Sequence, residues 1–442
     1  MLEARNKLGI IFFPAYDWAI SASHPEREER LLYTQDQLRE EGLFDIAGIQ
    51  EFKPDVATRE DIERVHFCFP DVESVCTKSH LISAGGAIKA ARLVMEGKVD
   101  KAFALVRPPG HHAMRVVHGS RGFCNVNIEA IMVEYIRAHY GRKRIAIVDT
   151  DCHHGDGTQD IFWHDKDTLF ISLHQDGRTL YPGTGFPQEL GGPNAMGRTI
   201  NIPLPPHTSD KGFLHVIEHV VKPILADFKP DLVINSAGQD NHFSDPITNM
   251  NFTARGYAML NKMLDPDIAV LEGGYAIQGA LPYVNLGICL AMAGLDFDGV
   301  CEPHLDDAAR EALEQPQRVT DYIERLCQEL PRLYFEPPKL PQEGQVEGDC
   351  FVRTRDIYYD TDGIRESQRD EATICPHCSG TIQYISHSTA NPRSVGIYIP
   401  QDACDRCHAE GLRMEELARN NPAYRYVQLI DRKEGCTRQY GF

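Results

Sequence analysis

The sequence predicts an α/β protein: a three-layer αβα domain with a mainly parallel sheet, followed by a small β-rich, zinc-ribbon-like module. Between residues 7 and 295, short apolar runs such as IAIV and LVIN alternate with longer helical patterns. Continuous apolar runs are typical of parallel strands buried on both faces, and strand–helix alternation is typical of α/β domains. The chain then becomes polar, short-stranded and cysteine-paired, which indicates a second, smaller unit.

The expected elements follow one another along the first domain. Strands are predicted at Leu8–Phe13, Ala102–Val106, Arg144–Val148, Thr168–Leu173, Thr199–Ile202, Leu232–Ser236 and Ile268–Leu271. Helices are predicted at Ile82–Glu96, Ile128–Tyr140, Gly212–Phe228, Arg255–Leu264, Ile277–Met292 and Asp306–Leu330. The segment PRLYFEPPKLPQEGQ is typical of a linker. We therefore expect the α/β domain at 1–335, a Pro-rich linker at 336–370 and the zinc-ribbon-like module at 371–442.

Composition narrows the class of protein. The net charge of −19 over 442 residues argues against a direct nucleic-acid binder, since phosphate contacts need a basic surface. It is compatible with a cationic partner such as a Lys-rich peptide or a polyamine, or with solubility alone. There is no signal peptide and no apolar run of membrane-spanning length, so we expect a cytoplasmic protein without a membrane partner.

Polar or glycine-rich segments follow five of the predicted strands. They are RPPGHH (Arg107–His112), DTDCHHGDG (Asp149–Gly157), SLHQD (Ser172–Asp176), SAGQD (Ser236–Asp240) and EGGY (Glu272–Tyr275). Ligands of open parallel sheets bind beyond the carboxyl ends of the strands. We therefore expect these segments to converge in space.

Three residues in these segments have the chemistry of a catalytic zinc site. Asp151 and His153 lie two residues apart in an extended segment, so their side chains point the same way, and Asp240 closes the site from a neighbouring strand. Two carboxylates and one imidazole leave a coordination position open for water or substrate. Each residue alone has a commoner structural role, as a helix cap or a buried histidine, but the combination favours a metal site.

Proton transfer and oxyanion stabilisation have candidates in the same segments. His111 and His112 can transfer protons near neutral pH, with the carboxylates of Asp149 and Asp156 to orient them. The hydroxyl of Tyr275 can donate to a developing oxyanion. The alternative is that the histidines fill a polar turn and the tyrosine packs on a loop.

These motifs, in this order, resemble the arginase–deacetylase superfamily, specifically the histone deacetylases and their bacterial relatives. The upstream HPEREER (His24–Arg30) is similar to an early segment of that family, and the resemblance covers about residues 7–300. RPPGHH resembles the class II branch and the bacterial histone deacetylase-like amidohydrolases. The resemblance implies hydrolysis of an acetylated or acylated amine, above all acetyl-lysine in proteins.

The resemblance assigns the same roles to the residues above and adds others. It implies that Phe123 and Tyr181 line an acyl-lysine tunnel, with Gly122, Gly273 and Ile247 as further substrate-binding positions, and that Arg30 lies in an internal acetate channel. It also implies a structural potassium ion. Its ligands would be the side chains of Asp149 and Ser172 and the backbone carbonyls of Asp149, Asp151, His153 and Leu173, while a second monovalent ion would involve Phe162, Asp165 and Thr168.

Some positions depart from the family pattern. Glu28 stands where proline is usual, and Tyr181 where phenylalanine is usual. Cys152, between two ligands, is expected to pack away from the metal. Ile247 stands where polyamine-specific relatives place a glutamate, which favours acyl-lysine over acetylpolyamine. The acidic residue that grips the substrate at the rim is expected near Asp71 or Glu73.

Two CxxC motifs near the C-terminus predict a second, structural zinc. Their members are Cys375, Cys378, Cys404 and Cys407. Four thiolates close a tetrahedral shell, so this ion would hold the fold rather than catalyse. A redox CxxC pair, or ligation by His377 or His408, is the rival reading. The module could bind a protein partner, brace the catalytic domain or mediate homo-oligomerisation.

Three other functions remain open from the sequence. The chain could be an amidohydrolase of acetylpolyamines or other small acylated amines. It could be a binuclear manganese ureohydrolase, although Gln239–Asp240–Asn241 offers only one of the carboxylates that such a site needs. It could also be a non-catalytic scaffold, which the complete set of His111, His112 and Tyr275 disfavours.

Overall fold

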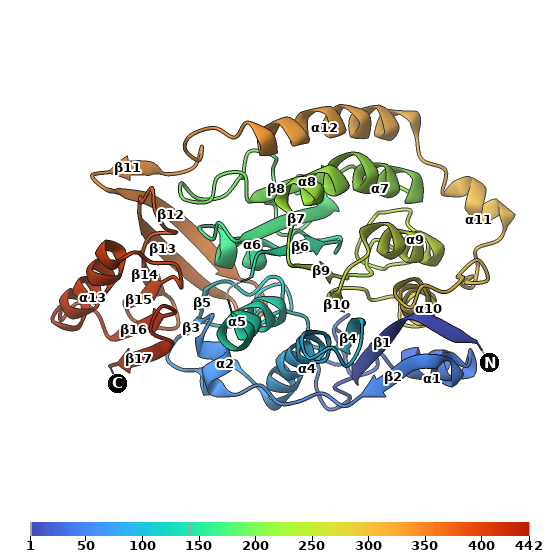
Figure 1. Cartoon of the computed structure of the whole chain (residues 1–442), viewed down its shortest axis with the longest axis horizontal. Coiled ribbons are helices and arrows are strands. Elements are labelled where there is room, and N and C mark those ends of the chain that lie inside the picture. The colour runs from blue at the N-terminus through green and yellow to red at the C-terminus, as the bar shows by residue number, and fades with distance from the viewer. Residues whose placement is uncertain (1, 142, 442) are drawn as a thin grey trace.

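The larger domain is built on a fully parallel sheet. In the computed structural model, which describes residues 2–141 and 143–441, this sheet has eight strands in the order β2-β1-β4-β10-β9-β6-β7-β8 (Figure 1). The strands are β1 (Glu3–Phe13), β2 (Ala47–Phe52), β4 (Lys101–Val106), β6 (Ile145–Asp149), β7 (Thr168–Gln175), β8 (Thr199–Leu204), β9 (Leu232–Ser236) and β10 (Ile268–Val270).

Side chains alternate along each strand between hydrophobic cores on the two faces of the sheet. On β4, for example, Phe103 and Leu105 enter one core, whereas Ala102 and Ala104 enter the other. The first core is covered by α1 (Thr34–Glu40), α7 (Asp210–Val216), the π-helical turn η2 (Ile217–Val221), α8 (Lys222–Phe228), α9 (Ala254–Leu264), α10 (Leu281–Met292) and α12 (Gln317–Phe335). The second is covered by α2 (Arg59–Glu63), α3 (Val72–Val75), α4 (Lys78–Met95), α5 (Ile128–Tyr140) and α6 (Asp156–Phe162). The three-layer prediction is therefore confirmed.

The predicted strands and helices of this domain all occur, with shifts at their ends. The edge strand β2 was not predicted, because its sequence AGIQEF is largely exposed and lacks an apolar run. The helix expected at Asp306–Leu330 is divided into α11 (Asp307–Ala312) and α12. The short turn η1 (Leu43–Asp45) and the two-stranded sheet of β3 (Phe67–Cys68) and β5 (Val116–Val117) complete the domain. Over the described residues, no helix has the length and apolarity needed to cross a bilayer.

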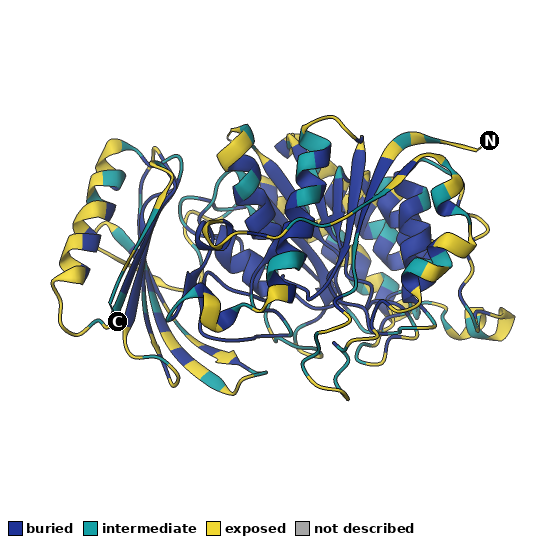
Figure 2. Ribbon diagram, turned by 90° about the horizontal axis from the view of Figure 1, so that it is seen from below, coloured by how far each residue is buried: buried dark blue, intermediate teal, exposed yellow. Residues whose placement is uncertain are grey.

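The described C-terminal region forms a separate seven-stranded sheet in chain order. Its strands are β11 (Gln345–Glu347), β12 (Cys350–Tyr359), β13 (Ile364–Thr373), β14 (Ile382–Ser388), β15 (Ser394–Ile399), β16 (Tyr426–Asp431) and β17 (Cys436–Tyr440). Neighbours are antiparallel except β15 and β16, which are parallel and joined through α13 (Asp405–Arg419). Figure 2 shows α13 on the outer face of this sheet, with its exposed side turned to solvent.

The prediction of a linker at 336–370 is wrong beyond Gly344, because β11, β12 and most of β13 lie within it. The strand β12 was not predicted because its sequence is polar, with Arg353 and Arg355, although much of the strand is buried. The module is therefore β-rich, as predicted, but larger than a zinc ribbon.

The C-terminal module packs against the catalytic domain through apolar and charged contacts. Phe67 and Phe69 share a hydrophobic cluster with Tyr384 and Tyr398 of the module. Beside this cluster, Asp160 of α6 forms an ion pair with Arg355 (Nη1–Oδ1 2.6 Å) and a longer one with Arg353 (3.4 Å), and both arginines also pair with Asp370 at 3.0 Å.

This ion network is almost completely buried. Burial raises the pKa of Asp160, but the Arg355 and Arg353 guanidiniums outweigh that effect and hold the pKa of the carboxyl below its ordinary value. Asp160 therefore ties α6 to the C-terminal module as a charged group. Its loss would leave two buried cations to share the single carboxylate of Asp370.

We expect Asp160→Ala to lower the free energy of unfolding by about 3 kcal/mol, because breaking a buried ion pair leaves charge without compensation. The measurement is the shift of the urea unfolding transition. Arg369→Ala is the matched control: it removes the more exposed pairs of Arg369 with Glu347 and Glu371 and should cost less than about 1 kcal/mol. A loss for Asp160→Ala no greater than that of the control would contradict the role given to the network.

Candidate active site

The predicted metal ligands meet at the carboxyl ends of the central strands. Ligand atoms of Asp151, His153 and Asp240 all lie within 4.8 Å of one another, and the three residues are buried. His153 Nδ1 lies 2.7 Å from Asp240 Oδ2 and 3.2 Å from Asp151 Oδ1. Asp151 and His153 follow β6, whereas Asp240 follows the adjacent strand β9.

Backbone N–H groups orient these carboxylates. Cys152 N donates to Asp240 Oδ1 (2.8 Å), and His153 N donates to Asp151 Oδ1 (2.8 Å). Gly273 N donates to Asp151 Oδ2 (2.6 Å). A Cβ at Gly273 would approach Asp240 Oδ2 to 2.4 Å and Asp151 Oδ2 to 2.5 Å, so only glycine fits there. Gly273, predicted to bind substrate, thus packs directly against the metal ligands.

The donor set fits a zinc ion. Two carboxylates and an imidazole are ligands that zinc accepts, and they leave a position open. Burial and the nearby charge of Asp151 raise the pKa of Asp240, because two buried carboxylates repel each other. A divalent cation would relieve this repulsion. Among the described residues, no third carboxylate joins this cluster, so it does not offer the ligands that a binuclear centre would need.

Each of the tandem histidines has the predicted carboxylate partner. His111 Nδ1 lies 3.0 Å from Asp149 Oδ2, and His112 Nδ1 lies 2.8 Å from Asp156 Oδ1. Both imidazoles are buried, and their rings are 4.1 Å apart between centroids. The Nε2 atoms are left to face the metal ligands, and that of His111 lies 3.8 Å from Asp151 Oδ1.

The electrostatic surroundings of the two histidines differ. Burial lowers the pKa of His111, but the carboxylates of Asp151 and Asp149 outweigh it and raise that pKa above its ordinary value. Burial, together with the positive charges of His111, His153 and Arg121, lowers the pKa of His112 well below its ordinary value. The two neighbouring imidazoles therefore have pKa values shifted in opposite directions.

Tyr275 lies against the predicted tunnel wall and the predicted channel arginine. Its ring is 5.6 Å from that of Phe123, at 84°, and the Arg30 guanidinium lies 5.0 Å from the ring centre. Arg30 is buried, donates to Gly274 O (2.8 Å) and Glu272 O, and pairs with Glu26 (2.7 Å). It therefore supports the loop that carries Tyr275.

Burial raises the pKa of Tyr275 well above its ordinary value, so the phenol stays protonated. Among the described residues, none forms a hydrogen bond with its hydroxyl, which leaves the O–H available to donate.

Other buried carboxylates position the site, and sequence reasoning missed them. Glu272 accepts hydrogen bonds from Gly110 N (2.7 Å) and His111 N (3.0 Å), which fixes the turn before the tandem histidines. Asp245 accepts from Tyr275 N (2.8 Å) and from Ile247 N (3.0 Å), so it joins the tyrosine to the predicted gatekeeper. Burial and the charge of Asp240 raise the pKa of Asp245 to about 8. Glu272 opens the segment EGGY, and Asp245 lies in the segment SDPIT. These two positions are the signal by which the sequence could have identified them.

The two aromatic residues predicted to line the tunnel both contact residues of the site. The Tyr181 ring lies edge-on to His112 (5.2 Å) and His153 (6.5 Å), while Phe123 contacts His24 (4.3 Å) as well as Tyr275. Gly122 has φ +51°, and a Cβ there would come within 2.3 Å of the His112 ring. Phe123 itself has φ +71°, a conformation that must be held by its surroundings.

The C-terminal module supplies part of that support. Asp360, in the turn between β12 and β13, accepts from Gly122 N and from the Tyr181 hydroxyl, both at 3.0 Å. Asp362 in the same turn accepts from Ser120 N (2.6 Å). No sequence motif pointed to these residues. The structure gives the predicted rim residues other partners: Asp71 caps α3, and Glu73 is exposed beside Arg59.

The residues expected around monovalent ions lie on neighbouring strands. Asp149 and Ser172 are opposite each other on β6 and β7, and Ser172 Oγ lies 2.9 Å from His174 Nδ1. At the second proposed position, the side chains of Asp165 and Thr168 are both bonded by the Arg137 guanidinium, which already supplies a cation. Cys152 is buried in the hydrophobic core and packs there as expected.

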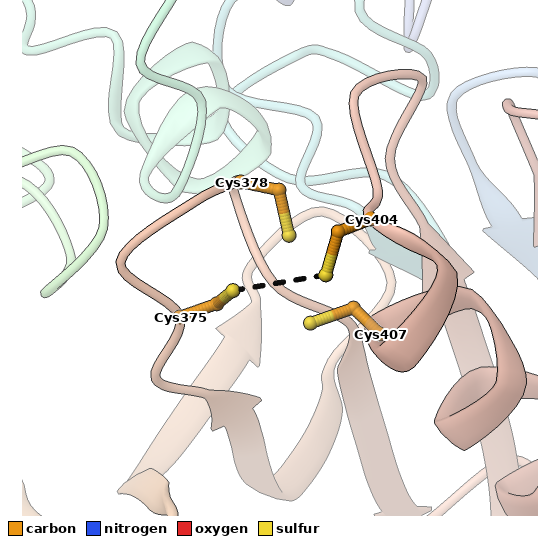
Figure 3. Close-up of side chains that lie close together, drawn as sticks. All are labelled: Cys375, Cys378, Cys404 and Cys407. Atoms are coloured by element: carbon orange, nitrogen blue, oxygen red, sulfur yellow. Dashed lines mark hydrogen bonds between the residues drawn. The ribbon is translucent and has the colours of Figure 1, made fainter.

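The four predicted cysteines of the module also converge. Figure 3 shows Cys375 and Cys378, from the loop after β13, pointing toward Cys404 and Cys407 at the start of α13. The Sγ atoms of Cys375 and Cys404 are 3.9 Å apart, too far for a disulfide but close to the edge, about 3.8 Å, of a zinc–sulfur tetrahedron. His408 pairs instead with Asp431 (2.8 Å), and His377 is exposed.

Comparison with known proteins gives a consistent result. Residues 70–285 match the model of the histone deacetylase domain. A probable deacetylase of Archaeoglobus fulgidus is 47% identical over 324 residues, covering 67% of this chain and 89% of that protein. Histone deacetylase 15 of Arabidopsis thaliana is 36% identical, and the match spans 58% of this chain but only half, 50%, of that protein. The crystal structure of the HDA15 HD domain superposes with a TM-score of 0.61 and 28% identity, over 74% of this chain and 96% of that one.

We expect two zinc ions per purified chain, and each site should lose its ion separately. Asp240→Ala removes one of the three ligands of the first site, and Cys375→Ser removes one thiolate of the second, so each variant should retain about one ion. Metal analysis of the purified proteins is the measurement. Cys436→Ser, which alters an exposed cysteine outside the cluster, should retain both ions. Full zinc content in Asp240→Ala or Cys375→Ser would refute the corresponding site.

Proposed function

We propose, because this chain belongs to the histone deacetylase family, that it removes acetyl groups from lysine side chains of proteins with the aid of one zinc ion. That it acts as a deacetylase follows from the family. The observation that carries the finer proposal is the convergence of Asp151, His153 and Asp240 with two His–Asp pairs and Tyr275. The aromatic rings of Tyr181 and Phe123 lie beside His112 and Tyr275, and a long acylated side chain could pack against such apolar surface.

The zinc would be held by Asp151, His153 and Asp240, and it would polarise the acetyl carbonyl and lower the pKa of water. Neutral His112 accepts a proton from the attacking water at Nε2, since its Nδ1 faces Asp156. His111, oriented by Asp149, donates toward the departing amine when it is protonated. Tyr275 donates its hydroxyl proton in a hydrogen bond to the carbonyl oxygen as that oxygen gains charge.

Acyl-lysine is favoured over small acylated amines by the apolar Ile247, which offers no charge to a polyamine. The rival substrate class gains some support from Asp360, an acidic and partly exposed residue beside the tunnel walls. We further propose the potassium ion at Asp149 and Ser172 and the structural zinc of the cysteine cluster as resident ions.

The substrate class is tested by kcat/KM for acetyl-lysine peptides and for acetylspermidine. We expect the peptide value to be at least about tenfold higher, a difference of about 1.4 kcal/mol in transition-state stabilisation. Higher efficiency with acetylspermidine would overturn the proposal of a protein substrate while leaving the deacetylase chemistry intact.

Tyr275→Phe should lower kcat for the acetyl-lysine peptide by about 10²–10³-fold, because one oxyanion donor is lost. Zinc content and thermal unfolding should not change, since the hydroxyl bonds none of the described residues. Tyr140→Phe, which alters a tyrosine bonded to Glu96 at the end of α5, serves as the control and should retain full activity. Turnover by Tyr275→Phe within threefold of the wild type would refute the oxyanion role.

A further inference from the structure

The loop that carries Cys375 and Cys378 lies against the catalytic domain, whose chain passes beside it in Figure 3. Asn194, in the loop before β8, accepts a hydrogen bond from Cys375 N at 3.0 Å. The amide nitrogen of the same asparagine donates to Thr373 O (2.9 Å) and to Ser379 O (2.8 Å). One side chain of the catalytic domain therefore fixes the backbone on both sides of the first CxxC motif.

The backbone of the module leaves room for this asparagine. Gly380 has φ +76°, and a Cβ there would come within 2.7 Å of Asn194 Nδ2 and 2.1 Å of Thr373 O. A side chain at this position would therefore push the asparagine away from the loop. The contact depends on local sequence in both domains, GGPNAMG in one and CPHCSG in the other.

A lysine of the catalytic domain connects the two CxxC motifs. Lys166, which follows α6, pairs with Asp402 Oδ2 at 2.9 Å and donates to His377 O at 3.3 Å. The same oxygen of Asp402 accepts from Ser379 N at 3.0 Å, and Asp402 precedes Cys404 by two residues. The lysine thus contacts the loops of both motifs. Because its side chain is partly exposed, this ion pair contributes less than a buried one would.

The position of the backbone decides how well four thiolates bind zinc. Zinc–sulfur distances and tetrahedral angles are narrowly defined, so the segments that carry the cysteines must be held in one arrangement. Groups that hold metal ligands in place typically contribute about 10–100-fold to metal affinity. In this protein, some of those groups belong to the other domain.

We infer, on the basis of the structural zinc proposed above, that Asn194 and Lys166 hold the cysteine loops in their metal-binding arrangement, so that zinc binding and docking of the two domains stabilise each other. The coupling is reciprocal: if the docked catalytic domain raises zinc affinity, bound zinc strengthens docking by the same factor. The zinc of the module therefore braces the junction between the domains, which is one of the three roles that the sequence left open.

Zinc release from the full-length, zinc-loaded protein to a chromogenic chelator tests the first half of this coupling. The release step of the cysteine site is identified by its absence in Cys375→Ser. Asn194→Ala should release this zinc about tenfold faster than the wild type, because three hydrogen bonds to the loop are lost. Lys166→Ala should release it at most about fivefold faster.

The control for both variants is Asn421→Ala, which alters an exposed asparagine after the far end of α13. It should release zinc at the rate of the wild type. A rate for Asn194→Ala equal to that of this control would overturn the inference.

Hydrogen exchange tests the second half of the coupling without altering Asn194. Loss of zinc in Cys375→Ser should speed amide exchange in residues 191–198 of the catalytic domain, where Ala195 N and Gly197 N are hydrogen-bonded. Asp240→Ala, which removes a ligand of the other metal site, is the matched control and should leave exchange in this segment unchanged. Equal exchange in the two variants would contradict a brace made by the zinc of the module.

Failure of the inference and failure of the structural zinc have different outcomes. A wild-type protein with a single zinc ion, which Cys375→Ser retains, overturns the structural zinc and with it the coupling. A wild-type protein with two zinc ions, both released at unchanged rates by Asn194→Ala, overturns the coupling alone.

Discussion

The active site depends on the burial of two carboxylates beside each other. Asp151 and Asp240 are fully buried, and in the described structure their side-chain ion-pair partners are histidines, not lysine or arginine. Their repulsion in a poorly solvated interior is offset by these imidazoles and by backbone N–H groups, and a bound cation would offset it further. The ends of β6 and β9 and the loop of Gly273 supply those N–H groups. The parallel sheet thus positions the backbone N–H groups that stabilise the two carboxylates, as well as the side chains of the site.

Buried carboxylates also fix the parts of the site that do not touch the metal position. Glu272 binds the backbone of the tandem-histidine turn, Asp245 binds that of Tyr275, and Glu26 pairs with both Arg30 and Arg107. A carboxylate that accepts two backbone N–H groups limits the motion of a loop more strictly than apolar packing does. The geometry of the five motif segments is therefore set by carboxylates other than the predicted metal ligands and the partners of the tandem histidines.

Sequence reasoning predicted the catalytic fold and the central residues for a clear physical reason. Buried parallel strands need apolar runs, and the chemistry concentrates at their carboxyl ends, so Asp151, His153 and Asp240 could be joined before the structure was known. The strands β12 and β13 escaped prediction because their buried arginines are neutralised by Asp160, which is nearly two hundred residues away along the chain. Asp360 could not be placed for the same reason: its partners, Gly122 and Tyr181, are distant in sequence, and no local pattern records such contacts.

The short helix α6 links the tandem histidines to the C-terminal sheet. Its first residue, Asp156, orients His112, and Asp160, one turn later, is held by the arginines of the C-terminal sheet. Proteolytic removal or misfolding of that sheet would therefore disturb the surroundings of His112 through a helix of seven residues. A shortened chain ending after α12 would keep Asp151, His153 and Asp240, yet it would lose the arginines that hold the helix carrying Asp156. The positions at which such a chain can be truncated, fused or exchanged are therefore limited by the contacts of α6, and not only by the boundary between the two sheets.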